Sequence, residues 1–274
     1  MKTEDFELLS GLVKERSGLV LSEDKLYLLE SRLLPLARRR GLAGLDDLAS
    51  AIRSKGDEPL LVEVTEAMTT NESSFFRDSR PFEIFRNFVL PKILESRAAK
   101  RSFRIWSAAC STGQEPYSLA MCLREEADRL KGWRTEIIAT DLSNEVLEKA
   151  KVGMYSQFEA QRGLPIEMLM KYFAQANDRW QVDASIRAMV QFRQCNLLHD
   201  ISAFGPADIV LCRNVLIYFD PATKRAVLEK MHRLMPPDGF LFLGGAETVL
   251  GVTKLFQPIN GQRGVYELAP ETSH

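Results

Sequence analysis

A short turn between an apolar strand and a helix constrains this chain more than any other feature. Apolar residues at 103–106 lead into small residues at 107–112, then Gly113, then a helix that opens with Glu115 and Pro116. Small residues let a ligand lie against the backbone, and a helix start offers unpaired N–H groups. A second predicted strand ends at Asp141, where an acid commonly holds ribose hydroxyls. These features predict an adenosine-containing cofactor at the carboxyl ends of parallel strands.

The same turn argues against two other nucleotide sites. It does not follow the pattern G-x-G-x-x-G, and it has no P-loop lysine. Dinucleotide and ATP binding are therefore disfavoured, because both depend on those residues to approach the phosphates.

Composition narrows the class of protein. The 274 residues are 45% hydrophobic and 27% charged, which is typical of a packed globular core. A net charge of −1 gives no basic excess for binding nucleic acid. The cysteines form no C-x-x-C pair and the histidines show no ligand spacing, so we expect reduced thiols, no metal and a cytoplasmic protein. We expect no membrane insertion, since no apolar run approaches the ~20 residues needed.

Residues 1–70 read as a small all-helical unit of their own. Apolar residues recur at helical spacing from 6 to 13, and Ser22 is a candidate N-cap for a helix that ends near Gly41. Pro35 predicts a kink or break in that helix. Two further helices are expected at 45–53 and 60–68.

Residues 71–101 read as a linker that caps the cofactor, and residues 102–274 alternate strands with helices. Strands are expected at 103–108, 135–140, 188–193, 207–212, 239–243 and 264–268, and helices at 81–88, 91–95, 116–130, 143–151 and 221–234. Such alternation predicts an α/β doubly wound parallel sheet covered on both faces. The short link 257–264 suits a hairpin, so the last strand should be antiparallel. That arrangement is the class I methyltransferase variant of the fold.

An insertion at about 152–187 interrupts the alternation. It contains a predicted helix at 165–173 and strand-like pieces at 179–182 and 185–187. We expect a small antiparallel β-subdomain.

Several polar residues should meet at the carboxyl edge of the sheet, and each has a plain structural alternative. Glu115 can bind a ligand or cap its helix, and Asp141 can hold a ribose or cap the helix near Ser143. The pair Arg213-Asn214 ends a buried strand and needs polar partners. Asn196 follows the third strand, where it can flank an adenine or simply lie at the surface.

A basic segment lies in the N-terminal unit. Arg32, Arg38, Arg39 and Arg40 fall in a stretch without acids. They can form a solvated helix face or a docking surface for an acidic partner. Adjacent arginines point in different directions around a helix, so only part of the segment can face one partner.

The whole chain closely resembles the bacterial chemotaxis receptor methyltransferase family (CheR type). The resemblance rests on separated motifs in the same order: Met68-Thr69-Thr70-Asn71-x-Ser73-x-Phe75-Phe76-Arg77, Trp106-Ser107-Ala108-x-Cys110-Ser111-Thr112-Gly113-x-Glu115-Pro116-Tyr117-Ser118, Ala139-Thr140-Asp141, Asn196-Leu197-Leu198 and Cys212-Arg213-Asn214-Val215-x-Ile217-Tyr218-Phe219. Departures are small: Ser73 replaces a usual Thr, Ala109 a usual Gly, and Gln114 the first acid of a usual Glu-Glu pair.

The resemblance implies methyl transfer from S-adenosylmethionine to glutamates of chemoreceptor cytoplasmic domains. It implies a cofactor site formed by Asn71, Ser73, Arg77, Gly113, Glu115, Asp141, Asn196, Leu197, Arg213 and Asn214. Arg77 and Tyr218 are the candidates for catalytic positioning, and the basic segment would dock the receptor. We expect the protein to be a monomer to which regulatory proteins can bind.

Some family members bind a receptor tail pentapeptide through the β-subdomain, using a glycine-containing loop. Here the corresponding turn at 175–179 is short and has no glycine, which predicts independence from that tether.

Other functions compete with this interpretation. A cofactor-sensing module could keep the pocket and lose transfer, although the intact Arg77, Glu115, Asp141 and Asn214 argue against it. Nucleic-acid or glutamine methylation is disfavoured, since Asn214 is followed by Val215-Leu216-Ile217 in place of the Pro-Pro-Tyr of amino-methylating enzymes.

Overall fold

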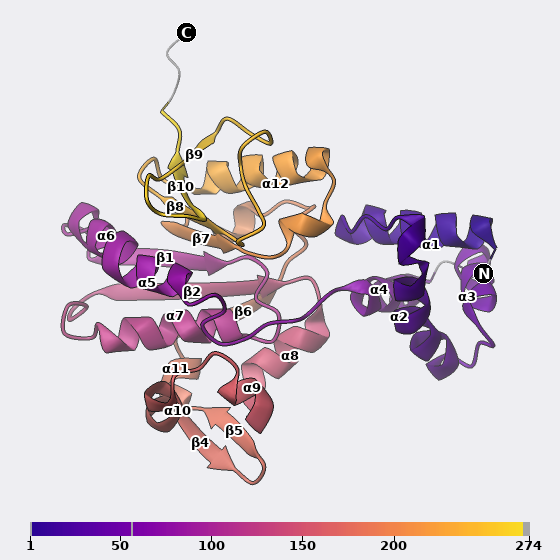
Figure 1. Ribbon diagram of the computed structural model, residues 1–274, viewed down its shortest axis with the longest axis horizontal. Coiled ribbons are helices and arrows are strands. Elements are labelled where there is room, and N and C mark those ends of the chain that lie inside the picture. The colour runs from indigo at the N-terminus through magenta and orange to yellow at the C-terminus, as the bar shows by residue number, and fades with distance from the viewer. Residues whose placement is uncertain (1, 56, 271–274) are drawn as a thin grey trace. The chain divides into compact units, whose positions relative to one another are not determined.

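The computed structural model describes residues 2–55 and 57–270, and the chain divides into two compact units (Figure 1). The helical unit comprises the chain up to Thr70 together with Tyr218–Lys224. The sheet unit comprises Asn71–Ile217 and the chain from Arg225 onward. Each unit encloses its own hydrophobic core. No described helix is both long and apolar enough to cross a membrane.

The helical unit packs amphipathic helices around leucine side chains. Its helices are α1 (Thr3–Ser17), α2 (Leu26–Arg39), α3 (Leu45–Lys55) and α4 (Glu58–Met68). Gly18, at φ 79°, ends α1, because a left-handed residue there satisfies the last carbonyls without a Cβ clash. Leu29 and Leu33 lie one turn apart on α2 and are fully buried.

For α2, the predicted N-cap is wrong, and of the kink or break predicted at Pro35 the break is wrong. Ser22 precedes a short 3-10 turn (Glu23–Lys25), and its side chain makes no capping hydrogen bond. The helix also continues unbroken past Pro35 to Arg39. Packing of Leu33, Leu36 and Ala37 in the core keeps the residues on both sides of Pro35 helical.

The sheet unit contains a seven-stranded sheet in the order β6-β2-β1-β7-β8-β10-β9. Its strands are β1 (Ser102–Ser107), β2 (Arg134–Asp141), β6 (Val190–Gln194), β7 (Ile209–Cys212), β8 (Phe240–Leu243), β9 (Phe256–Pro258) and β10 (Val265–Leu268). The five strands from β6 to β8 pair in parallel. Successive strands are added on one side of β1 up to β6 and on its other side from β7 onward, so the strand order reverses between β1 and β7. Doubly wound sheets bind ligands at the carboxyl ends of the strands beside such a reversal. The α/β class is confirmed.

Helices follow the strands as the alternation predicts. They are α5 (Arg80–Ile84), continued by a π-turn (Phe85–Val89) into α6 (Leu90–Ser96), then α7 (Gln114–Glu125), α8 (Asn144–Val152) and α12 (Pro221–Leu234). α7 and α8 both pack on β2 and β6. Pairing of β10 with β8 is antiparallel, as predicted. The partner in the hairpin is different: residues 259–264 join β10 to β9, a strand that the sequence analysis missed and that includes residues 257 and 258 of the predicted link.

A three-stranded antiparallel sheet forms the insertion, in the order β3-β5-β4. The insertion as a whole comprises β3 (Met154–Ser156), α9 (Gln157–Gln161), α10 (Ile166–Tyr172), β4 (Phe173–Ala176), β5 (Arg179–Val182) and α11 (Ala184–Arg187). The expected strand at 185–187 is wrong, because Asp183 accepts a hydrogen bond from the Ser185 amide and starts α11.

Candidate functional site

The loop after β1 lies against both neighbouring strands. Its Ala108 amide donates to the Leu211 carbonyl at 2.8 Å, and its Cys110 amide donates to Thr140 at 2.9 Å. Gly113 has a φ of 95°, and a Cβ there would meet the Ala150 Cβ at 2.9 Å. The small residues and this glycine therefore let the loop turn tightly beneath the helix start.

Asp141 ends β2 and links two turns of the carboxyl edge. Its Oδ2 accepts from the Ser111 amide at 2.8 Å, and its Oδ1 accepts from the Ser143 amide at 3.1 Å. Asp141 does not cap α8, whose N-cap is Ser143; it accepts from the amide of that residue and so supports the turn before the helix. The side chain is buried, and each carboxylate oxygen can accept more than one hydrogen bond.

Glu115 forms a buried ion pair in place of capping its helix. Its Oε1 accepts from the Ser107 hydroxyl at 2.8 Å, and its Oε2 accepts from Arg213 Nη1 at 2.9 Å. The Arg213 side chain is only 2% exposed. Its Nη2 also donates to Asp78 Oδ2 at 2.7 Å and to the Arg77 carbonyl at 3.0 Å. One guanidinium therefore joins the ends of β1 and β7 to the segment before α5.

The guanidinium is not fully satisfied. Within the described residues, Arg213 Nε is buried without a hydrogen-bond partner. The Phe82 ring lies 5.8 Å from the guanidinium carbon, so the cation faces an aromatic surface as well as carboxylates. Two carboxylates therefore pair with one arginine, the buried Glu115 and the exposed Asp78.

The segment that carries Asn71, Ser73 and Arg77 is held over the loop after β1. The Asn71 carbonyl accepts from the Ser111 hydroxyl at 2.7 Å, and the Arg77 side chain donates to the Glu72 carbonyl at 3.0 Å. This segment then bends sharply: Phe76, Asp78 and Ser79 all have positive φ. Non-glycine residues adopt this conformation at a cost, so surrounding contacts hold the bend in place.

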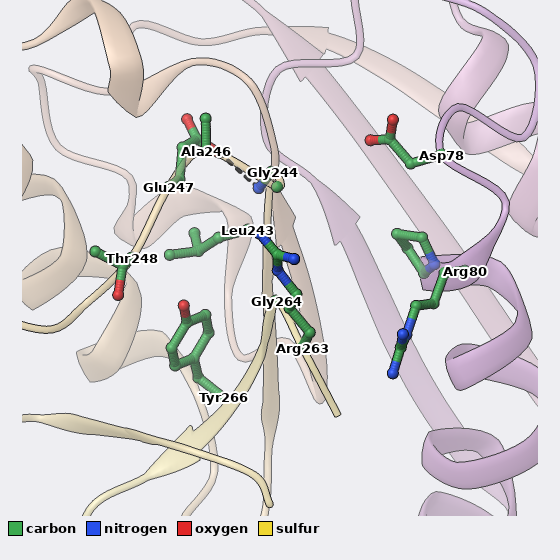
Figure 2. A pocket seen from close by; sticks show the side chains of 12 residues that line it. Asp78, Arg80, Leu243, Gly244, Ala246, Glu247, Thr248, Arg263, Gly264 and Tyr266 are labelled. Atoms are coloured by element: carbon green, nitrogen blue, oxygen red, sulfur yellow. Dashed lines mark hydrogen bonds between the residues drawn. The ribbon is translucent and has the colours of Figure 1, made fainter. Parts of the chain in front are cut away.

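Glu247 is a buried acid that the sequence analysis missed. Its carboxylate accepts from the backbone amides of Asn214 at 2.8 Å, Val215 at 3.0 Å, Ile217 at 3.2 Å and Gly244 at 2.6 Å. It therefore fixes the turn after β7, in which Asn214 has a φ of 59°. The bond to Gly244 is drawn in Figure 2. No local sequence motif marks Glu247, because it lies 33 positions from Asn214.

Lys230 on α12 supports the turn after β6 in the same way. Its ammonium donates to the carbonyls of Leu197 at 3.1 Å, His199 at 2.9 Å and Leu198. Burial lowers the pKa of Lys230 below its usual value. Within this turn the Asn196 Oδ1 accepts from the Leu198 amide at 3.0 Å, so Asn196 braces the backbone that carries Leu197.

Tyr218 and the basic segment belong to the helical unit. The Tyr218 ring packs against that unit's core, and its carbonyl accepts from the Val20 amide at 3.0 Å. Arg32 donates to the carbonyls of Met68 at 2.6 Å and Thr69 at 2.7 Å, so it is part of the packing of α2 on α4. Arg32 thus bonds the end of α4, which agrees with the expectation that only part of the basic segment can face one partner.

The remaining arginines of the segment lie at the exposed end of α2. Arg40 pairs with Glu63 at 2.6 Å, and this pairing lowers the pKa of the Glu63 carboxyl. Arg38 and Arg39 are exposed.

Comparison with known proteins decides the family. The family of the CheR methyltransferase SAM binding domain matches residues 71–265, and that of the CheR methyltransferase all-alpha domain matches residues 4–69. The chain belongs to the CheR methyltransferase family. It is therefore an S-adenosylmethionine-dependent methyltransferase, and the resemblance stated from the motifs is confirmed.

Relatives match along nearly the whole chain. The chain is 40% identical over 266 residues to chemotaxis protein methyltransferase Cher2 of Pseudomonas putida, covering 95% of this chain and 96% of the relative. It is 41% identical to chemotaxis protein methyltransferase 1 of Pseudomonas aeruginosa, with the same coverage. The chemotaxis protein methyltransferase of Escherichia coli is 33% identical, over 97% of this chain and 91% of that protein.

Proposed function

We propose that this CheR-family enzyme methylates glutamate side chains on chemoreceptor cytoplasmic domains, giving glutamyl 5-O-methyl esters and S-adenosylhomocysteine. The observation that carries the proposal is the match to chemotaxis protein methyltransferases over 95% of the chain. The buried ion pair of Glu115 and Arg213, which the exposed Asp78 joins from the segment before α5, supports it.

We further propose that the cofactor binds across the carboxyl ends of β1, β2, β6 and β7. The residues present fit S-adenosylmethionine: acids stand where a ribose and a cationic centre need them, and the loop after β1 is made of small residues. The proposed contacts are Asn71, Ser73, Arg77, Gly113, Glu115, Asp141, Asn196, Leu197, Arg213 and Asn214. When bound, S-adenosylmethionine supplies an electrophilic methyl group.

The acceptor needs little activation by the chain. A glutamate side chain has a reference pKa of ~4.3, so it is ionised at neutral pH and requires no general base. The work of the protein is to align the carboxylate with the methyl group and to exclude water, because charge is neutralised as the ester forms.

Arg77 and Tyr218 are the proposed positioning residues. Arg77 lies in the segment with positive φ angles, and its carbonyl accepts a hydrogen bond from the Arg213 guanidinium. Tyr218 follows the turn that Glu247 fixes, one residue after Ile217. Arg77→Ala should lower turnover, and wild-type turnover in that variant removes Arg77 from the site.

The receptor-docking part of the proposal rests on the exposed Arg38 and Arg39 rather than on Arg32. Charge reversal at both positions should raise the KM for a receptor fragment, and added salt should weaken docking of the unmodified enzyme. Arg129→Glu combined with Lys131→Glu, both in an exposed part of the sheet unit, is a control with the same change in total charge.

Independence from a receptor tail pentapeptide is also a proposal. The turn between β4 and β5 consists of Asn177 and Asp178 alone, which leaves no extra loop there. Saturable binding of a tail peptide to the enzyme would overturn this point.

Mapping the modified residue tests the function. Labelled S-adenosylmethionine is incubated with the enzyme and a chemoreceptor cytoplasmic fragment, and the labelled peptides are sequenced by mass spectrometry. Label on glutamates that is lost when those glutamates are replaced by alanine supports the proposal. Label on lysine, glutamine or nucleic acid contradicts it.

A further inference from the structure

A pocket of about 430 Å³ opens beside the turn that Glu247 fixes. An adjoining hollow of about 610 Å³ shares part of its wall. Figure 2 shows Asp78 and Arg80 along one side of the pocket and Arg263 and Tyr266 along the other. The first side comes from the segment entering α5, and the other from the end of β8 and from β10.

Cations are the charges that this pocket offers to a ligand. Arg80 and Arg263 are both exposed, and both line the pocket and the adjoining hollow. The acids in the wall are directed elsewhere: Asp78 bonds Arg213 at 2.7 Å, and Glu247 accepts from backbone amides. The hydrogen bond from Arg80 to the Gly261 carbonyl is long, at 3.4 Å, so a ligand carboxylate would readily replace that carbonyl as the acceptor.

The pocket adjoins the proposed site. Two of its lining residues bond residues of that site, since Asp78 accepts from Arg213 and Glu247 accepts from the Asn214 amide. Pro81, Leu243 and Tyr266 add apolar surface between the arginines. Such a lining suits the methylenes of an acidic side chain, with its carboxylate at the guanidinium groups.

We propose that this pocket binds a second acidic side chain of the acceptor polypeptide, held between Arg80 and Arg263. The inference rests on the proposed function, since it assigns the pocket to the substrate of that reaction. It makes the enzyme select a glutamate by its acidic neighbour as well as by its own carboxylate. A bidentate arginine contact distinguishes a carboxylate from an amide, because the amide nitrogen is a donor.

Binding and transfer together test the proposal. Two fluorescent helical peptides are used as probes: one with two glutamates a helical turn apart, and one with the second glutamate replaced by glutamine. Arg80→Ala and Arg263→Ala should each weaken binding of the first peptide by up to about five-fold, the upper range for exposed pairs. The double variant should bind both peptides equally, with the affinity for S-adenosylhomocysteine unchanged.

Arg129→Ala serves as the matched control, since it removes an exposed arginine of the sheet unit away from the pocket. A double variant that keeps the wild-type preference for the first peptide refutes the pocket assignment, as does a wild type with no preference. Transfer by the wild type is scored separately. If the wild type binds the first peptide more tightly than the second but methylates no glutamate, the proposed function is refuted and the acidic subsite is supported.

Discussion

Replacing Gly244 by alanine probes the turn after β7 without replacing any charged residue. A Cβ at this position would lie 2.7 Å from Glu247 Oε2, 2.8 Å from Asn214 Nδ2 and 2.9 Å from the Asn214 amide nitrogen. Ordinary contact begins near 3.4 Å, so these atoms must retreat by roughly 0.5 to 0.7 Å. The backbone at Gly244 is not in the left-handed region, so the conflict is one of space alone.

The magnitude follows from the bonds that this movement lengthens. Glu247 accepts from Asn214 at 2.8 Å and from Gly244 at 2.6 Å, and such a shift takes both bonds to the edge of the useful range. Hydrogen bonds to a charged group contribute about 1.5–3 kcal/mol each. Gly244→Ala should therefore lower the free energy of unfolding by about 2–4 kcal/mol, allowing for partial relaxation.

Gly245→Ala provides a neighbouring control. Nothing lies within 4 Å of a Cβ at that position. Its free energy of unfolding should change by less than about 1 kcal/mol, because the only effect is on the entropy of the unfolded chain. Urea denaturation measures both variants, and calorimetry measures binding of S-adenosylhomocysteine. Equal stability and equal affinity in the two variants would refute the role given to Glu247 and its turn.

Three other predictions follow from the described contacts. Glu115→Gln removes the buried one of the two carboxylates that pair with Arg213, and should lower the free energy of unfolding in a urea titration by about 3 kcal/mol; a loss no larger than that of an exposed acid such as Glu145→Gln contradicts it. Arg32→Met should destabilise the helical unit by more than Arg38→Met does, since only Arg32 holds the end of α4. Burial raises the pKa of Cys122 and Cys195 to about 12, so iodoacetamide should label neither thiol in the folded protein at pH 9, and rapid labelling there would refute their burial.

Much of the sheet unit is predictable because local pattern and tertiary role agree. The apolar runs that form β1, β2 and β7 are fully buried, and the small residues and acid that follow them mark the ligand edge. Among the motif residues, the structure joins Asn71 and Asp141 through Ser111, and Glu115 to Arg213, while the role of the whole set in binding the cofactor stays a prediction. The N-terminal helices are predictable for the same reason, since their apolar spacing matches their burial.

What the sequence missed depends on distant partners. Glu247 and Lys230 act on backbone groups of turns far away in sequence, so no local motif marks them. The short strand β9 pairs only with β10 and has too few residues for a pattern. Arg32 was read as a surface cation because its partners are backbone carbonyls at the end of another helix. Arg80 and Arg263 meet at one pocket only through the fold.

The chemical nature of the transferred methyl group tests the central claim most directly. The enzyme is given methyl-labelled S-adenosylmethionine and a chemoreceptor cytoplasmic fragment, and the product is treated with mild base. Release of the label as volatile methanol is the predicted result, because a glutamyl methyl ester is base-labile. Label that stays on the protein under these conditions would mean methylation at nitrogen or carbon, and would contradict the assignment of glutamate as the acceptor.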